Sequence, residues 1–515
     1  MSSQLTPKPT DPKAPPRQSA SRGAFILMGG TLGSRVTGLL RNALFVQLFP
    51  PTVTDAFNVA LKVPNLFREL LAEGALTNSF VPVYKGLGEE DAKRLAGALL
   101  SLLFLVNTLL VLLAVWAAPW VVRLLLQENA NIDYALTVAL TRIVFPFLAA
   151  ISFSALAMGI LQAEERFFAP AWAPVALNVV TATLMLIYPG QAIPLAVAFV
   201  LGGAAQLLCQ IPALIKNDLL PKLGRWWHPA LSSVLVLMVP FTFTTGARQF
   251  LNVVATNVLS VLPQGSVTAF ENANLFLGLA LGLFSISPAL AYYSRLSANA
   301  AQEPERFSET LLEGLRFITF LTVPAGLLLF FLAAPAIQSV LNFLSGMNPQ
   351  VVQLSVLALA PLGLAVFPIG LRNLLIRTFY VRREVVTPIV ISTLFISLNA
   401  LLYTLLAPRY GIAGLSWSTV VVEWTQLVVL VFYVRRREAF RLDTLLSHTL
   451  RVWLAALGAS GLMVAILASL PLPPGWWGFL LQAVIGVSVL GLFYILFGLR
   501  LRLPEIEQLT RRLRR

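Results

Sequence analysis

Long apolar stretches separated by short polar loops follow one another along almost the whole chain. A helix that crosses a bilayer needs about 20 consecutive, mainly apolar residues. We find about 14 stretches that meet this requirement, with boundaries good to a few residues. They are residues 24–49, 54–83, 95–122, 134–161, 169–188, 193–215, 230–262, 266–294, 310–342, 350–378, 386–407, 411–434, 447–470 and 475–499. The pattern therefore predicts an all-α polytopic membrane protein with about 14 transmembrane helices.

Composition agrees with this fold class. Of the 515 residues, 57% are hydrophobic and 12% are charged, whereas about 25% are charged in a soluble globular domain. Residues 1–22 are rich in Pro and Ser and lack apolar periodicity, which predicts a disordered tail. They contain no apolar segment with a cleavage site, so we expect no signal peptide. One cysteine and two histidines offer neither a disulfide framework nor a metal site.

Lys and Arg gather in alternate loops. One set of loops, together with both termini, holds Lys8, Lys13, Arg17, Arg22, Lys85, Lys93, Arg94, Arg166, Lys216, Lys222, Arg225, Arg295, Arg306, Arg382, Arg383, Arg435, Arg436, Arg437, Arg441 and the tail from Arg500 to Arg515. The loops between them hold only Arg123 and Arg409. Because basic residues are retained on the cytoplasmic side, both termini are predicted to be cytoplasmic. This topology accounts for the net charge of +14 without a nucleic-acid partner.

An internal repeat divides the predicted spans. One constant shift along the chain places Thr31, Gly33 and Arg35 on Thr244, Gly246 and Arg248, and Ala56, Phe57 and Ala60 on Ala269, Phe270 and Ala273. Transporters built from such repeats bind substrate between their halves. We therefore predict a cytoplasmic tail (1–22), an N-lobe with spans one to six (23–216), a C-lobe with spans seven to twelve (217–436), a further pair of spans (437–500) and a basic cytoplasmic tail (501–515).

The first two spans contain charges that lipid does not accommodate. A basic residue in the middle of a bilayer costs roughly 3 kcal/mol, so these side chains are expected to face a water-filled cavity between helices. A cavity lined with Arg and Lys would be cationic and suited to an anionic substrate. The charges in residues 29–83 are Arg35, Arg41, Asp55, Lys62, Arg68 and Glu73, with Glu69 beside them.

The sequence gives no sign of an enzyme. It contains no Gly-x-Ser-x-Gly, His-Glu-x-x-His or phosphate-binding Gly-x-x-x-x-Gly-Lys motif, so we predict no catalytic residue and no metal. Without a nucleotide-binding domain, transport would have to use an ion gradient, the membrane potential or removal of the substrate. A membrane enzyme acting on lipid-linked sugars would need clustered carboxylates, and a scaffold would not need deep arginines.

Three segments, GSRVTGLLRN, TDAFNVALKVPNLFRELLAEGAL and FVPVY, resemble the MurJ (MviN) family of bacterial lipid II flippases, in the group of multidrug and oligosaccharidyl-lipid exporters. The sharp motifs lie within residues 30–84. The resemblance implies a protein of the bacterial cytoplasmic (inner) membrane that moves lipid II, or a related undecaprenyl-pyrophosphate-linked glycan, to the outer leaflet by alternating access. The sequence leaves the oligomeric state open, and we favour a monomer. Membrane lipids would be its other partners, and the last two spans would hold the lipid tail.

The resemblance also suggests roles for individual residues. It implies that Arg35, Arg41 and Arg68 contact the substrate, and Lys62 is a further candidate for the cavity wall. Asp55 and Glu73 would pair with the arginines while the cavity is empty, because lipid II carries a pyrophosphate and carboxylates that bind the same guanidinium groups. Arg35 and Arg41 are six residues apart, about 120° around a regular helix. A bend at Gly33 or Gly38 would be needed for both to face a narrow cavity.

Two departures from the family pattern concern the C-lobe, and one of them is that the seventh span lacks the Asp-Arg pair that the family resemblance leads us to expect. The family resemblance leads us to expect an arginine soon after Ala273-Asn274, where this chain has Leu275. Arg248, which the repeat aligns with Arg35, would supply that charge, and pairing with Glu271 or Glu423 is its alternative role. The arginines at 372 and 377 are interpreted as part of the basic cluster at the cytoplasmic end; lining the mouth of the cavity is the alternative.

The energy source is open. Some members of the family resemble sodium-coupled carriers with acidic C-lobe ligands. Here Asn399 and Thr419 are candidate sodium ligands, but Tyr403 stands where a carboxylate would help, and Glu423 is the remaining deep acid. Two other functions stay open: a flippase for another lipid-linked oligosaccharide, such as an O-antigen unit, and a cation-coupled multidrug exporter, which the mainly basic deep charges disfavour.

Overall fold

A computed structural model describes residues 20–71, 75–224, 226–299, 304–382, 384–438 and 441–513. Within these ranges, the side chains of residues 20–25, 70, 71, 75, 77, 78, 239–245, 247, 248, 304, 305 and 509–513 lie outside the description. Most of the predicted N-terminal tail, Glu73 and the side chain of Arg248 are therefore not described. The described ranges are helical and contain no strand, which confirms the all-α fold class.

The helices are α1 (Ala20–Leu48), α2 (Pro51–Leu71), α3 (Ala75–Lys85), α4 (Glu89–Leu125), α5 (Tyr134–Val144), α6 (Pro146–Ala163), α7 (Phe168–Ile187), α8 (Ala192–Leu208), α9 (Ile211–Lys216), α10 (Pro229–Leu259), α11 (Ser266–Leu281), α12 (Ser287–Asn299), α13 (Pro304–Phe331), α14 (Ala333–Leu341), α15 (Pro349–Gly363), α16 (Val366–Val381), α17 (Val386–Arg437), α18 (Leu442–Ser469), α19 (Trp476–Arg500) and α20 (Pro504–Leu513). A π-helical turn, η1 (Gly282–Ile286), joins α11 to α12. Side chains cap several helices: Asp133 accepts from the Leu136 N–H at 2.9 Å at the start of α5.

Every predicted span falls on one helix or on consecutive helices. By length and composition, nine helices or helix groups within the described ranges qualify as membrane spans. They become ten when α15 and α16, bent by 50°, count as one span. This test counts α17 once, although Gly411 interrupts its 52 residues with φ 59°. The multi-pass architecture is therefore confirmed, whereas the number fourteen stays a prediction.

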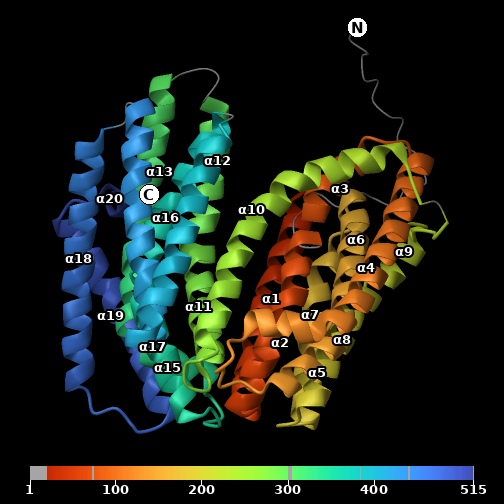
Figure 1. Ribbon diagram of the computed structural model, residues 1–515. Coiled ribbons are helices and arrows are strands. Elements are labelled where there is room, and N and C mark those ends of the chain that lie inside the picture. Colours follow the sequence, from red (N-terminus) through yellow and green to blue (C-terminus); the bar gives the residue numbers. More distant parts are fainter. Residues whose placement is uncertain are drawn as a thin grey trace.

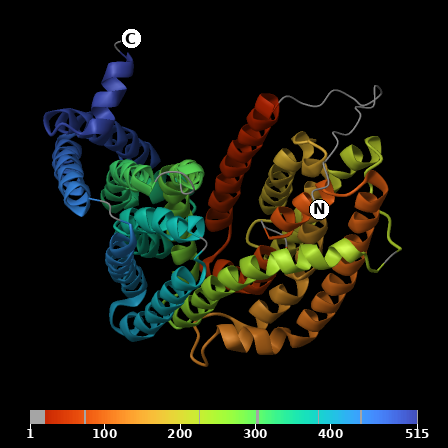
Figure 2. The same ribbon diagram turned by 90° about the horizontal axis from the view of Figure 1, so that it is seen from above.

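The helices form two groups that stand side by side (Figure 1). In the first group, α7 packs against α1 and α8, and α6 packs against α3, α4 and α8. The second group contains α11 to α17, and α18 and α19 pack at its edge against α13 and α14. Helix α10 runs across the molecule (Figure 2) and contacts α2, α3 and α4 as well as α17. The lobe boundaries inferred from the repeat stay a prediction.

Asp55, at the start of α2, joins the two groups at one end of the molecule. Its carboxylate accepts hydrogen bonds from the Gly265 N–H at 2.6 Å, the Thr268 N–H at 2.9 Å and the Thr268 hydroxyl at 2.6 Å. It therefore caps α11, where the N-terminal N–H groups need an acceptor and the helix dipole favours a negative charge. Thr268 is the position that the repeat aligns with Asp55, so equivalent positions of the repeat meet here.

Two further contacts at this end follow the same repeat. The Leu344 N–H donates to the Gln47 side-chain carbonyl at 2.6 Å. The Asn131 N–H donates to the Ser260 backbone carbonyl at 2.8 Å. The same shift along the chain aligns Gln47 with Ser260 and Asn131 with Leu344, so the second contact is the counterpart of the first. The groups are thus joined on both sides of Asp55, at the end whose loops hold few basic residues.

Candidate functional site: a polar cavity between the helix groups

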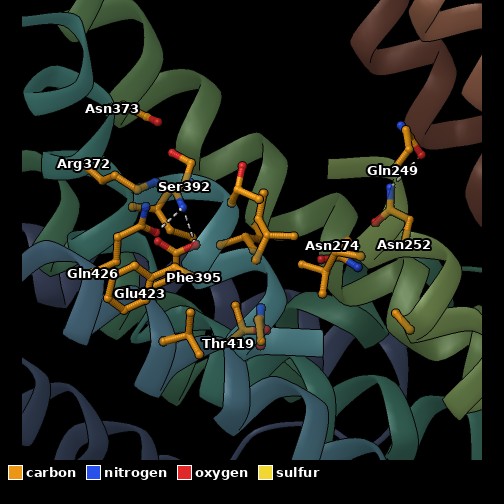
Figure 3. A pocket seen from close by; sticks show the side chains of 18 of the residues that line it. Gln249, Asn252, Asn274, Arg372, Asn373, Ser392, Phe395, Thr419, Glu423 and Gln426 are labelled. Carbon is orange, nitrogen blue, oxygen red and sulfur yellow. Dashed lines mark hydrogen bonds and ion pairs between the residues drawn. The ribbon is translucent and has the colours of Figure 1, made fainter. Parts of the chain in front are cut away.

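A cavity of about 730 Å³ lies between the two groups. Helix α2 lines it from the first group, and α10, α11, α15, α16 and α17 line it on the other sides. Gln249, Asn252 and Asn274 lie on one side of this cavity, and Arg372, Glu423 and Gln426 lie on the opposite side (Figure 3). Its volume is in the range of small-molecule sites, about 300–1,000 Å³. A polar cavity between two repeats is the expected place for a substrate in a transporter of this kind.

The charges of this central cavity nearly balance. Four basic and three acidic residues line it within the described part of the chain: Lys62, Arg68, Arg372, Arg377, Glu69, Glu271 and Glu423. The lining therefore carries an excess of one positive charge. The cavity is thus less positively charged than the sequence predicts. Carboxylates hold Lys62 and Arg372 in place, so an anionic ligand would have to replace or join these partners.

Helix α2 contributes polar contacts that bridge the groups. Lys62 forms an ion pair with Glu271 of α11. The Gln249 amide of α10 donates to Glu69 at 2.5 Å and accepts from Asn252 at 3.0 Å. Sequence reasoning missed these two amides; amide side chains inside apolar spans are the signal that would have found them, because a buried amide needs partners.

Arg372 and Arg377 lie in the cavity wall, the alternative to their interpretation as part of the cytoplasmic basic cluster. The Arg372 Nη1 donates to Glu423 Oε1 at 2.6 Å and to Gln426 Oε1 at 3.2 Å. The Arg377 guanidinium lies 5.5 Å from the ring centre of Tyr293. The two arginines and Tyr380 share the face of α16 that meets the cavity. The overall hydropathy of α16 does not show this, because it does not distinguish one face of a helix from another.

Arg35 and Arg41 lie outside the residues that line this cavity, whereas Arg68 and Lys62 belong to the lining. Arg41 donates from Nη1 to the Asn178 side chain at 3.0 Å, and its guanidinium lies 5.2 Å from the ring centre of Phe199. Both partners belong to the first group of helices. The angle between Arg35 and Arg41 around α1 thus turns the two side chains towards different neighbours. Neither contact of Arg41 tests whether these arginines bind the substrate.

Arg35 reaches from α1 to the second group at η1. A Cβ atom added to Gly282 would stand 3.0 Å from both Nη1 and Nη2 of Arg35. This contact is tighter than ordinary van der Waals packing, so the glycine is what lets the guanidinium approach the helix. π-Helical turns are often found at functional sites, and this one lies in the second group, where Arg35 of the first group approaches it.

Replacement of Gly282 by Ala is therefore expected to displace the Arg35 guanidinium and to slow transport about two- to fivefold, or about 1 kcal/mol. Gly278→Ala, one turn earlier, is the matched control, because a Cβ there meets no atom within 4 Å. Transport rates of the two variants in proteoliposomes check this. Equal rates for both would mean that the position of Arg35 does not matter.

The acidic residues have other partners than the sequence suggests. The described partners of Asp55 are the groups at the start of α11 rather than an arginine. Glu271 pairs with Lys62 and Glu423 with Arg372. Because Glu73 and the side chain of Arg248 lie outside the described residues, their predicted roles stay predictions.

The candidate sodium ligands Asn399 and Thr419 both line the cavity. The Tyr403 hydroxyl lies 2.8 Å from the Thr419 hydroxyl, so Thr419 already has a polar partner. The Asn399 side-chain oxygen is buried without a hydrogen-bond partner. Within the described ranges, no group of three or more His, Cys, Asp or Glu side chains could hold a metal ion. Sodium binding therefore stays open.

Two solved structures share this architecture. A solved structure of a lipid II flippase MurJ in an inward closed conformation matches with a TM-score of 0.75 at 23% identity, covering 93% of this chain and 99% of the other. A multidrug resistance MATE transporter of the MOP superfamily, in an inward-facing conformation, matches with a TM-score of 0.68 at 16% identity, covering 81% and 98%. At these identities the matches establish the fold alone, which this chain shares with both structures.

The sequence comparison is more specific. The family described as lipid II flippase MurJ matches residues 46–486. The lipid II flippase MurJ of Burkholderia cenocepacia is 30% identical over 494 residues, covering 93% of this chain and 95% of the relative. The chain belongs to the lipid II flippase MurJ family.

Proposed function

We propose that this chain translocates lipid II, the lipid-linked precursor of peptidoglycan, from the inner to the outer leaflet of the bacterial cytoplasmic membrane. The proposal rests on family membership over residues 46–486. The observation that carries it is a polar cavity between two helix groups that are joined at one end by Asp55. Movement of a headgroup across the membrane needs no covalent chemistry, so the residues of the cavity act by binding and release.

The proposed mechanism is alternating access. In the state seen here, Asp55 and the contacts beside it join the groups at the end with few basic loops, and the headgroup enters from the opposite, cytoplasmic end. Pyrophosphate and carboxylate oxygens then compete for Lys62 and Arg372, whose present partners are Glu271 and Glu423. Opening of the Lys62–Glu271 pair changes a contact between the groups and favours a rocking motion, while the polyprenyl tail stays in lipid along α18 and α19.

The orientation and coupling belong to the same proposal. Both termini are placed in the cytoplasm, as the distribution of Lys and Arg indicates. The chain acts as a monomer, and the membrane potential or a sodium gradient drives the return step. If the membrane potential drives the return step, dissipating the potential slows transport. If a sodium gradient drives it, sodium-free buffer slows transport.

The test is translocation of fluorescent lipid II by the purified chain in proteoliposomes. We expect transport above protein-free vesicles, with competition by unlabelled lipid II. A flippase for an O-antigen type of lipid-linked oligosaccharide is the second candidate, which Leu275 in place of the expected arginine favours. Stronger competition by an undecaprenyl-pyrophosphate-linked O-antigen unit than by lipid II would contradict the proposal and favour this alternative.

A further inference from the structure

Arg372 is fixed in the wall of the cavity by two side chains of a neighbouring helix. It lies on α16, and its Nη1 is held by Glu423 at 2.6 Å and Gln426 at 3.2 Å, both on α17 (Figure 3). The Arg372 side chain is 24% exposed, whereas that of Glu423 is 10% exposed. Both residues line the cavity, and the guanidinium is the more exposed member of the pair.

The Nε of this guanidinium has no hydrogen-bond partner. An arginine binds a carboxylate or phosphate most strongly through two parallel N–H bonds, and Nε and Nη2 form such a pair. Both contacts of Arg372 with α17 use Nη1, and Nε is buried without a hydrogen-bond partner. An unsatisfied buried N–H costs free energy. A small movement that let an anion reach this edge would remove that cost.

Arg372 also supplies the cavity with a basic side chain that α11 lacks. Leu275 on α11 stands where an arginine is expected, so α11 offers no basic side chain at that point. Arg372 extends into the same cavity from α16, and Arg68 lines it from α2. With Arg377, three arginines line one cavity, and Arg68 and Arg372 come from different helix groups, which suits a ligand with more than one anionic centre.

We propose that Arg372 anchors the anionic headgroup in the second helix group, with Glu423 and Gln426 as positioning residues that hold its guanidinium. The ligand chemistry is a pyrophosphate or a carboxylate of the headgroup, and the inference rests on the proposed function. Rigid helices carry all three residues, so little conformational freedom is lost when the anion binds. The alternative role is a buried ion pair that only stabilises the fold.

Three variants separate these roles in the full-length chain: Arg372→Gln, Glu423→Gln and the double variant. If Arg372 anchors the headgroup, Arg372→Gln and the double variant lower lipid II translocation at least about tenfold. Glu423→Gln lowers it less, about threefold, because the new amide oxygen still accepts from Nη1. If the pair is only structural, each single variant lowers the thermal midpoint and the rate, and the double variant, with a neutral hydrogen-bonded pair, restores both.

The matched control is the double variant Arg382→Gln/Glu438→Gln. Arg382 donates to Glu438 at 2.7 and 2.8 Å, and the pair joins the ends of α16 and α17 outside the cavity. Its translocation rate should equal that of the wild type. Binding of inorganic pyrophosphate to the same purified proteins is measured in parallel. It is expected to weaken at least about tenfold in Arg372→Gln and in Arg372→Gln/Glu423→Gln, and to be unchanged in the control.

These two readouts separate the outcomes. A wild-type rate and wild-type pyrophosphate binding in Arg372→Gln/Glu423→Gln would overturn the role of Arg372. A wild-type protein that binds pyrophosphate through Arg372 but does not move lipid II would contradict the proposed function and leave the anion site supported.

Discussion

Asp55→Ala is expected to lower lipid II translocation at least tenfold and to expose the end of the molecule where the helix groups meet. Its carboxylate is buried and satisfies two N–H groups and one hydroxyl at the start of α11. Each donor left unsatisfied costs about 1–3 kcal/mol. A loss of about 3 kcal/mol would shift the balance between the two states of the transporter more than a hundredfold. Alternating access needs both states, so the rate falls.

Accessibility of a single cysteine measures this shift. Cys209, the only cysteine, is first replaced by Ala, and Ser266→Cys then places a thiol at a buried position beside the contact. A membrane-impermeant maleimide added outside should label this thiol faster in Asp55→Ala than in the parent. Asp133→Ala is the control, because Asp133 also caps a helix but lies within the first group. Unchanged labelling and transport in Asp55→Ala would mean that this contact does not close the cavity.

Arg68→Ala is expected to reduce translocation about 30- to 100-fold, because a charge-assisted hydrogen bond to an anionic headgroup contributes about 1.5–3 kcal/mol and a guanidinium makes more than one. Arg68→Lys keeps the charge but loses the planar fork of donors, so we expect an intermediate loss of about tenfold. Transport of fluorescent lipid II by both variants checks this order.

The control for charge alone is Arg94→Ala. Arg94 is exposed and pairs with Glu90 within α4, and such surface pairs contribute about 0–1 kcal/mol. Its transport should match the wild type. Should Arg68→Ala transport as fast as Arg94→Ala, the headgroup does not depend on the basic residues of α2.

The sequence predicts the fold class and the positions of the long apolar helical segments, because a bilayer demands a long apolar stretch for each crossing. It does not predict α20, which lies in the segment interpreted as a basic tail. It is less informative where helices bend or break. The 50° bend between α15 and α16 and the break at Gly411 depend on packing between helices, which hydropathy does not contain.

The candidate site is predicted only in part. Arg68 and Lys62 line the cavity as expected, but Arg35 and Arg41 do not, because their spacing on α1 turns them towards different neighbours. Asp55 illustrates the same limit. A buried carboxylate near several arginines suggests ion pairing, yet its partners come from α11, far along the chain. Only the internal repeat, which aligns Asp55 with Thr268, contains a trace of that contact.

The most direct test of the account is a cryo-electron microscopy map of the purified chain with lipid II bound. The account predicts density for the pyrophosphate inside the cavity, within hydrogen-bonding distance of Arg68 or Arg372 and with at least one of the pairs Lys62–Glu271 and Arg372–Glu423 opened. Density for the headgroup outside the cavity, with both pairs intact, would contradict it.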